Sequence, residues 1–326
     1  MIVEHIERHL GIGGGDIASI LGLSKFKTAI DVWEVKTQKK SSAFAPTFRS
    51  DKAFALESLM LSEYSKLYDL QNTSQYIIPN VSIIDDEEPI FQGHTDGIVI
   101  DLKNDKRPLS EIVVDDTLQD KVKKVLECKL VRFAMRPTWG ENGSTDIPTE
   151  YLLQCAWYAS ILHVDVDLPV IFGDDDAIHV FHYKRDLELE KAIREHARRF
   201  WYDFVVPDKM PQPQTVDDLS RYYPQSNKDV KPIGLDVYEV AKSLKQVNSE
   251  LKALQQQKEA YEKRLKEEIA ESSGISFGGI PVANWITYDT QKFDRASFKD
   301  EHPELFEEYT SIEKQRRFYL KMEHSE

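Results

Sequence analysis

The sequence contains little cysteine and no long hydrophobic run, and each absence excludes a class of protein. Two cysteines stand among the 326 residues, at positions 128 and 155. This small number argues against a disulfide framework and excludes an iron–sulfur cluster held by four cysteines. No apolar stretch is long enough to span a bilayer, and the N-terminal residues lack a signal-peptide pattern. We therefore expect a soluble, cytoplasmic protein.

Positive charge is outnumbered, with 42 Lys and Arg against 56 Asp and Glu. The formal net charge is −14 at pH 7, whereas proteins that bind nucleic acid usually present a basic surface. Acidic residues cluster in expected loops at 85–88, 115–116 and 174–176, while basic residues gather between positions 121 and 136. This distribution is compatible with a local basic groove on an acidic body.

The spacing of apolar residues predicts an α/β domain in the first two thirds of the chain. Helices are expected at 28–36, 52–67, 149–162 and 187–205, and strands at 76–78, 81–84, 90–100, 124–131, 168–172 and 177–183. A linker at 208–213 contains prolines and marks the end of this domain.

A different region follows the linker. Apolar residues at heptad-like spacing predict one long helix at 236–270, typical of a coiled coil or an oligomer contact. Two strands at 275–280 and 282–288, a short helical stretch and a basic-aromatic run at 314–321 complete the chain. That run is either a contact to a DNA backbone or a solvated strand edge. The expected domains are 1–212, 213–273 and 274–326.

A glycine-rich segment precedes the first expected helix. Gly13, Gly14 and Gly15 lie within it, and Asp16 is a plausible N-cap for the helix that follows. The segment lacks the Gly-Lys-Ser/Thr of a nucleotide P-loop and follows no clear strand, which argues against ATP binding. It is either a phosphate-binding turn or a flexible turn before a core helix.

Asp96, Glu127 and Lys129 form the most informative motif. Asp96 lies in a segment, 93–97, that we expect to be a turn between two strands, and Glu127 and Lys129 should share one strand face. Two carboxylates beside a lysine suit Mg²⁺ or Mn²⁺ and phosphodiester hydrolysis. The alternative is the solvated face of an ordinary strand.

Two further polar residues lie on expected helices. Glu57 stands within an apolar stripe, where a carboxylate needs a partner, so it is either a structural ion-pair residue or another metal ligand. Gln154 lies on an amphipathic helix, where it would contact a phosphate or a base, or be an ordinary polar residue.

Four elements occur in the order found in a known family. They are the glycine-rich segment 11–22, Glu57 in its helix, the two halves of the metal motif at 93–99 and 126–130, and the glutamine-bearing segment 151–158. Together they resemble the YqaJ-type phage recombination nucleases, the lambda-exonuclease-like branch of the PD-(D/E)XK superfamily. The ordered set is far more specific than any one of its motifs.

The resemblance implies a fold and an activity. The fold is a PD-(D/E)XK core, a central mixed sheet flanked by helices, with a C-terminal long helix or coiled coil and a small α+β extension. The activity is Mg²⁺-dependent degradation, with Mn²⁺ as a substitute, of one strand of linear duplex DNA from an end, 5′ to 3′. The implied setting is phage-type recombination in a bacterial host cell, with a ring-like homotrimer, a single-strand annealing partner and no membrane.

The resemblance also implies roles for individual residues. Glu57, Asp96, Glu127 and the main-chain carbonyl of Cys128 would hold the metal. Lys129 would orient the attacking water or stabilise charge on the phosphate, and Gln154 would position these groups or the nucleic acid.

We expect a 5′-phosphate and DNA-binding set around this centre, formed by Arg8, main-chain N–H groups of Gly13, Gly14 and Gly15, His94, and Arg132. Four positions depart from the family pattern: Gly15 and His94 stand where serines are usual, Thr95 stands where proline is usual, and Ala156 stands where a second glutamine is usual. Phosphate dependence should therefore be weaker than is usual for the family. Two other functions stay open, a restriction- or repair-type endonuclease on the same fold and a non-catalytic DNA-binding assembly protein.

Overall fold

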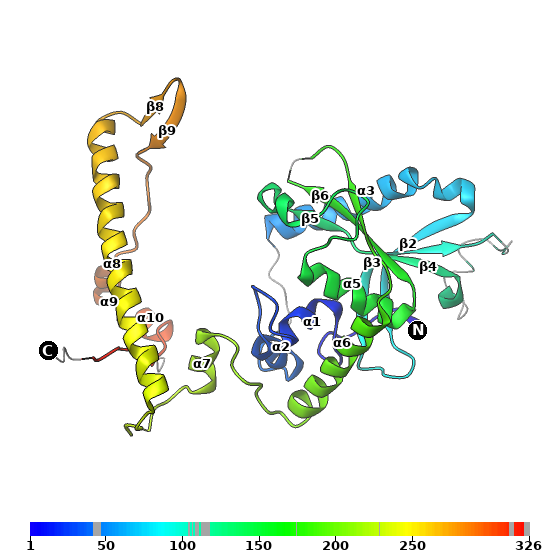
Figure 1. Cartoon of the computed structure of the whole chain (residues 1–326), viewed down its shortest axis with the longest axis horizontal. Helices are drawn as coiled ribbons and strands as arrows, with labels where there is room; N and C mark the ends of the chain where they lie inside the picture. The colour runs from blue at the N-terminus through cyan, green and yellow to red at the C-terminus, as the bar shows by residue number, and fades with distance from the viewer. Residues whose placement is uncertain are drawn as a thin grey trace. The chain divides into compact units, whose positions relative to one another are not determined.

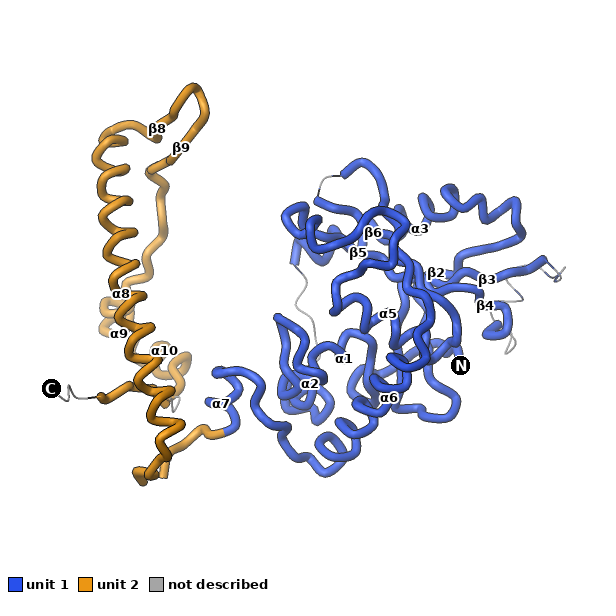
Figure 2. The backbone as a smooth tube through the Cα atoms, viewed as in Figure 1, with its two compact units in different colours: residues 1–222 blue, residues 223–326 orange. Residues whose placement is uncertain are grey.

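A computed structural model describes residues 1–41, 47–103, 105, 107, 111, 118–173, 175–227, 229–312 and 316–322. The expected acidic pair 115–116, the aspartate at 174 and residues 314–315 of the basic-aromatic run lie outside these ranges. The chain forms two compact units, Met1–Tyr222 and Tyr223–Glu326, which are coloured separately in Figure 2. Each unit is described by itself.

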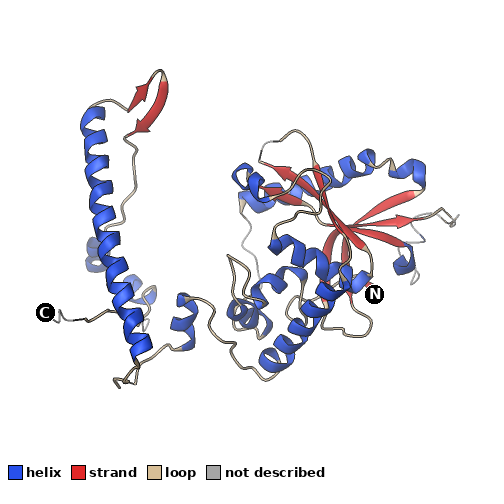
Figure 3. Cartoon of the chain, viewed as in Figure 1, coloured by secondary structure: helices blue, strands red, loops and turns tan. Residues whose placement is uncertain are grey.

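Unit 1 is built on one mixed sheet (Figure 3). The first four strands pair antiparallel in the order β1-β2-β3-β4, whereas β4 and β5 both pair parallel with β6, and β7 pairs antiparallel with β6. The strands are β1 (Ile2–Val3), β2 (Gln75–Ile84), β3 (Gln92–Asp101), β4 (Val122–Leu126), β5 (Lys129–Val131), β6 (Asp165–Phe172) and β7 (His179–Tyr183).

Helices cover both faces of this sheet (Figure 1). Alternation along the strands separates two apolar clusters: Ile98 and Ile100 of β3 pack on one side, and Val99 packs on the other. Helix α3 covers the side of Val99, and the remaining long helices cover the opposite side. The helices of unit 1 are α1 (Gly14–Ile20), α2 (Ala29–Lys36), α3 (Phe48–Leu67), α5 (Thr149–Leu162), α6 (Leu187–Phe200), which continues into a π-helical turn to Val205, and α7 (Val216–Tyr222).

Segment 93–97 is not a turn, and this prediction was wrong. The residues form the interior of β3, paired with β2 from Gly93 to Gly97. The glycines serve side-chain packing: a Cβ at Gly93 would lie 2.7 Å from the Tyr158 ring, and one at Gly97 would lie 3.3 Å from Ile77. Glycine in a strand therefore marks a close approach here rather than a chain reversal.

The single strand expected at 124–131 is also interrupted. Strand β4 ends at Leu126 and β5 begins at Lys129, and both keep one register on β6. Strand β3 pairs with β4 as far as Leu126. The sheet therefore divides at Glu127, and the residues of the expected metal motif lie at the point of division.

Unit 1 extends beyond the expected linker because α7 is attached to α2. Arg221 donates to Asp31 at 2.9 Å, and the Thr28 hydroxyl donates to Asp218 at 3.0 Å. Thr28 is the N-cap of α2 and Asp31 completes its capping box, so these contacts also fix the start of that helix.

Unit 2 contains the long helix α8 (Leu235–Ile269), the hairpin β8 (Gly274–Phe277) and β9 (Ile280–Asn284), and the short helices α9 (Arg295–Glu301) and α10 (Pro303–Glu308). The expected first strand, 275–280, is divided by a turn at Gly278 and Gly279, whose φ values are +59° and +79°. Two consecutive left-handed residues reverse the chain in a tight hairpin. No helix in the described residues is long and apolar enough to cross a membrane.

The expected architecture, a mixed sheet flanked by helices with a long C-terminal helix and a small α+β extension, is thus confirmed.

Candidate active site

Asp96 lies on β3 beside the point where the sheet divides. Its Oδ2 accepts a hydrogen bond from the main-chain N–H of Cys128 at 2.6 Å. Burial raises the pKa of Asp96, while Lys129, the Cys128 N–H and His94 oppose this rise. Strands β3 and β4 are no longer paired beyond Leu126. The hydrogen bond from Cys128 to Asp96 instead fixes the backbone just after Glu127.

Glu127 is the most buried carboxylate of the motif, with 4% of its surface exposed. Its Oε1 accepts hydrogen bonds from Lys129 Nζ and Gln154 Nε2, both at 2.6 Å. Its Oε2 is buried and has no hydrogen-bond partner among the described residues. A buried acceptor of this kind carries a free-energy penalty unless a cation or donor reaches it.

Lys129 contacts Glu127 across the break between β4 and β5, rather than along the continuous strand that the sequence predicted. Burial lowers the pKa of Lys129, but the Glu127 carboxylate raises it more strongly, and the net shift is upward. The ammonium also lies over the Tyr151 ring, 5.5 Å from its centroid. Lys129 is therefore held as a cation by its pair with Glu127.

Glu57 of α3 belongs to the same electrostatic group. Burial and the nearby Asp96 carboxylate raise its pKa to about 7, although Lys129 opposes the shift. The pKa of Glu127 is also raised to about 7, by burial first and then by Asp96 and Glu57 against the opposing Lys129. Three carboxylates thus share one lysine, so the group lacks positive charge.

Helix α5 connects the centre to the glycine-rich segment. Gln154 Nε2 also donates to the Tyr158 hydroxyl at 3.0 Å, and that hydroxyl donates to the main-chain carbonyl of His94 at 3.0 Å. A Cβ at Gly14 would lie 3.0 Å from Gln154 Cγ and 3.1 Å from the Tyr158 ring. The start of α1 therefore packs directly against the residues that orient Glu127.

The expected phosphate-binding residues have different surroundings. The side chain of Arg8 is exposed, while its carbonyl accepts from Lys36 Nζ at 2.6 Å. His94 is exposed, with its Nδ1 3.3 Å from Ser82 Oγ. The Gly13 N–H donates to Asp16 Oδ2 at 3.0 Å, so this donor is already used. A Cβ at Gly15 would meet open space.

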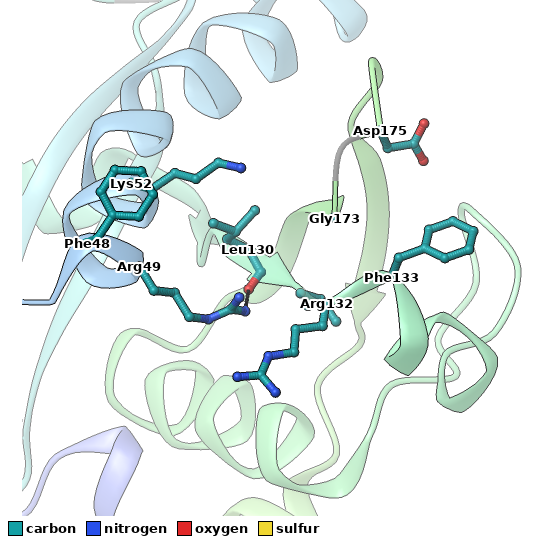
Figure 4. A pocket seen from close by; sticks show the side chains of 9 residues that line it. Phe48, Arg49, Lys52, Leu130, Arg132, Phe133, Gly173 and Asp175 are labelled. Carbon is teal, nitrogen blue, oxygen red and sulfur yellow. Dashed lines mark hydrogen bonds between the residues drawn. The ribbon is translucent and has the colours of Figure 1, made fainter. Parts of the chain in front are cut away.

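A cavity of about 770 Å³ opens next to Leu130, the residue that follows Lys129 (Figure 4). It is bounded by the start of α3 and by β5, which also carry Glu57 and Lys129. Arg49 donates to the Leu130 carbonyl at 3.0 Å, whereas Lys52 and Arg132 have no carboxylate partner among the described residues. The lining residues are Phe48, Arg49, Lys52, Leu130, Val131, Arg132, Phe133, Gly173 and Asp175.

Sequence reasoning found Arg132 but missed Arg49, Lys52 and the two exposed phenylalanines of this cavity. Their signal was weak, because single basic and aromatic residues near the ends of helices and strands are common. Only the fold brings the start of α3 next to the end of β5.

The oxygen atoms available at this centre are of the chemical type that binds a hard divalent cation. Carboxylate and carbonyl oxygens are the ligands that Mg²⁺ and Mn²⁺ prefer. The unpartnered Glu127 Oε2 and the raised pKa values of Glu57, Asp96 and Glu127 are the features that a cation would relieve. Within the part of the chain that the structure describes, no three His, Cys, Asp or Glu side chains converge at ligand distances.

Comparison with known families now identifies the domain, because residues 5–164 match the model of the YqaJ-like viral recombinase domain. Residues 5–164 belong to this family. The resemblance expected from the motifs is confirmed. Every predicted site residue, from Arg8 to Gln154, lies within the YqaJ-like domain.

A related protein extends the similarity beyond the YqaJ-like domain. The "Uncharacterized protein YqaJ" of Bacillus subtilis (strain 168) is 23% identical over 326 residues, covering 97% of this chain and 92% of that protein.

Solved structures similar to this chain include an alkaline exonuclease, LHK-Exo, from Laribacter hongkongensis. It has 13% identity and a TM-score of 0.41, covering 67% of this chain and 95% of that one. A phage related exonuclease from Haemophilus somnus 129PT has 16% identity and a TM-score of 0.39, covering 61% and 96%. Because both TM-scores are below 0.5, neither likeness assigns a residue or an activity here.

Proposed function

We propose that this chain is a Mg²⁺-dependent exonuclease that degrades one strand of linear duplex DNA from an end. The observation that carries the proposal is the buried, unpartnered Glu127 Oε2, held between Asp96 and Lys129 in a YqaJ-like domain. The large majority of buried side-chain acceptors in folded proteins have a hydrogen-bond partner. A carboxylate held with one oxygen free is arranged for a ligand.

Glu57, Asp96, Glu127 and the main-chain carbonyl of Cys128 would hold Mg²⁺, or Mn²⁺ in its place. Bound there, the ion would polarise a phosphate and lower the pKa of a bound water. The Cys128 backbone is suited to this task because Asp96 fixes its N–H. Gln154 and Lys129 both hold Oε1 of Glu127, which leaves Oε2 for the ion.

Lys129 serves the chemistry as a cation. Since the raised pKa keeps Lys129 protonated at neutral pH, it stabilises negative charge that develops on the phosphate, or orients water by donation. It does not accept a proton from the attacking water.

The cavity beside β5 would hold the DNA strand. Lys52 and Arg132 provide positive charge without carboxylate partners among the described residues, and Phe48 and Phe133 are 86% and 69% exposed. Phosphates pair with such cations, and nucleobases stack on exposed aromatic rings. A local basic groove of this kind allows a chain of net charge −14 to bind DNA.

We propose 5′-to-3′ digestion, with the 5′-phosphate near Arg8, Gly14, Gly15 and His94. The support is that Gly14 packs against Gln154 and that His94 lies two residues from Asp96. Gly13 would contribute little, because its N–H is used by Asp16. Arg8→Ala should slow digestion of a 5′-phosphorylated duplex more than that of a 5′-hydroxyl duplex. Loss of label from the 3′ end, or equal rates for the variant and wild type, would reject this pocket.

A ring-like homotrimer and a single-strand annealing partner complete the proposal, for recombination of the phage type. Membership of the YqaJ-like family supports both, and no contact within this chain does.

The activity is tested on linear, nicked and closed circular duplexes with Mg²⁺. We expect digestion of the linear duplex and an intact closed circle. Asp96→Ala should reduce the rate by several orders of magnitude, whereas Asp101→Ala, at the other end of β3, should digest normally. Cleavage of closed circles would indicate an endonuclease, and near-normal digestion by Asp96→Ala would reject the site.

A further inference from the structure

Helix α8 carries a stripe of uncovered apolar side chains. The residues repeat at alternating steps of three and four. Seven of the eight apolar side chains are between 39% and 70% exposed, and Leu244 is half-buried. Lys258 occupies one position in this series, and Glu268 occupies its last. The apolar members are Val237, Val240, Leu244, Val247, Leu251, Leu254, Tyr261 and Leu265.

Unit 2 leaves most of this stripe uncovered, although Leu244 is half-buried. Ile269 is its one buried hydrophobic side chain among the described residues. The chain that returns from the hairpin runs along a different face of α8, where Trp285 lies with Glu259, Lys263 and Lys266. Those three residues belong to the polar side of the heptad. Unit 2 by itself therefore leaves most of the apolar stripe available for another surface.

Charge favours a second copy of the chain as that partner. Helix α8 carries seven Asp and Glu residues and seven Lys and Arg residues, so it is neutral within a chain of net charge −14. Two α8 helices can therefore approach without the repulsion that the rest of the chain would produce.

The positions of Lys258 and Glu268 select the orientation. Parallel pairing in register would oppose Lys258 to Lys258 and Glu268 to Glu268 along the apolar seam, which is unfavourable. Antiparallel pairing centred between residues 252 and 253 opposes Leu251 to Leu254, and Val240 to Leu265. The same register places Lys258 against Val247, where its aliphatic stem packs and its ammonium reaches solvent.

We propose that α8 pairs antiparallel with α8 of a second copy of this chain, in the register that opposes Leu251 to Leu254. The contact is isologous, since each helix presents the same surface to the other. It is independent of the proposed nuclease activity and of any ring formed by unit 1.

The first test measures the mass of the full chain in solution by light scattering. Leu251→Lys combined with Leu254→Lys should lower the mass to that of the assembly that unit 1 forms without α8: from a dimer to a monomer if unit 1 does not associate, and from joined rings to a single ring if it forms a trimer. Ala253→Lys with Gln256→Lys adds the same charge to the exposed outer face and should leave the mass unchanged. An unchanged mass for the Leu251 and Leu254 variant would overturn the proposal.

The second test fixes the orientation without disturbing the centre of the stripe. Val240→Cys and Leu265→Cys chains, each with a different tag, are mixed and oxidised. Antiparallel pairing should give disulfides between the two variants and none within either variant alone. Disulfides between two Val240→Cys chains, or no cross-link in the mixture, would contradict the register. Cys128 and Cys155 are buried and should not react.

Discussion

At the scale of single residues, Glu127 shows how burial and pairing compete. Its Oε1 receives two short hydrogen bonds, one from a lysine, and both favour the ionised carboxylate. Burial and the neighbouring carboxylates favour the protonated form instead. Their effect is larger, since the pKa of Glu127 is raised to about 7. The three carboxylates of the centre therefore have too little positive charge around them, as is expected of a site that binds a cation.

Glu57 provides the clearest prediction from these shifts. Its pKa of about 7 in the folded chain lies above the ordinary value of 4.5. Because the folded chain holds this proton more tightly than the unfolded chain, Glu57 does not lower the free energy of unfolding below pH 4.5. That free energy falls as the pH rises through 7 and the buried carboxyl ionises. Without divalent cations, Glu57→Gln should therefore raise the free energy of unfolding at pH 8 by about 1 kcal/mol and change little at pH 4.5.

Urea unfolding at the two pH values measures this difference. Ser58→Gln, at an exposed site of the same helix, removes no titrating group, so it is the matched control and should change stability equally at both pH values. A Glu57→Gln variant that is destabilised at pH 8 would show that the carboxylate is a structural ion-pair residue.

At the scale of elements, a buried aspartate attaches α3 to the sheet. Asp167 of β6 is fully buried and accepts from the Tyr64 hydroxyl of α3 at 2.6 Å, from Lys124 of β4 at 2.6 Å, and pairs with His182 of β7 at 2.7 Å. Its carbonyl also accepts from the Glu127 N–H at 3.1 Å. One residue therefore positions the helix of Glu57 relative to the strand that leads to Glu127.

Asp167→Asn should destabilise the fold by about 2–4 kcal/mol, because it leaves Lys124 without its buried counter-charge. Asp165→Asn on the same strand affects a part-exposed pair with Lys184 and should cost less than about 1 kcal/mol. Denaturant midpoints measure both variants. Equal midpoints would mean that Asp167 does not anchor α3.

The cavity between α3 and β5 makes a prediction about DNA binding. Measured in an Asp96→Ala background, Lys52→Ala and Arg132→Ala should each weaken binding and reduce the slope of log K against log salt by about 1. Lys66→Ala, at the other end of α3 and paired with Glu63, should change neither. Slopes that match the control would place the DNA elsewhere.

The elements were predictable where local pattern alone determines them. The helix at 149–162 was predicted with its observed ends, and the long helix at 236–270 was shifted by one residue from α8. Prediction failed where packing decides, as at segment 93–97, whose glycines make room for Tyr158 and Ile77. The candidate site divides in the same way. Asp96, Glu127 and Lys129 follow from spacing, but Asp167 and Lys52 require the tertiary fold.

At the scale of the whole molecule, the two units differ in how they bury apolar surface. Unit 1 has two apolar clusters, one on each face of its sheet, whereas unit 2 has a single buried hydrophobic residue among those described. The catalytic proposal belongs to unit 1 and the self-association proposal belongs to unit 2. Each can fail without the other.

The single buried side chain of unit 2 has a calorimetric consequence. Unfolding changes heat capacity in proportion to the apolar surface that it exposes to water, and ordinary domains gain about 1.2–1.5 kcal/mol/K per 100 residues. Most of the apolar side chains of unit 2 are already in contact with water when it is folded by itself, so its unfolding exposes little further apolar surface. Its helix should therefore melt without a heat-absorption peak of its own at high dilution, and a peak should appear and move to higher temperature as the protein is concentrated.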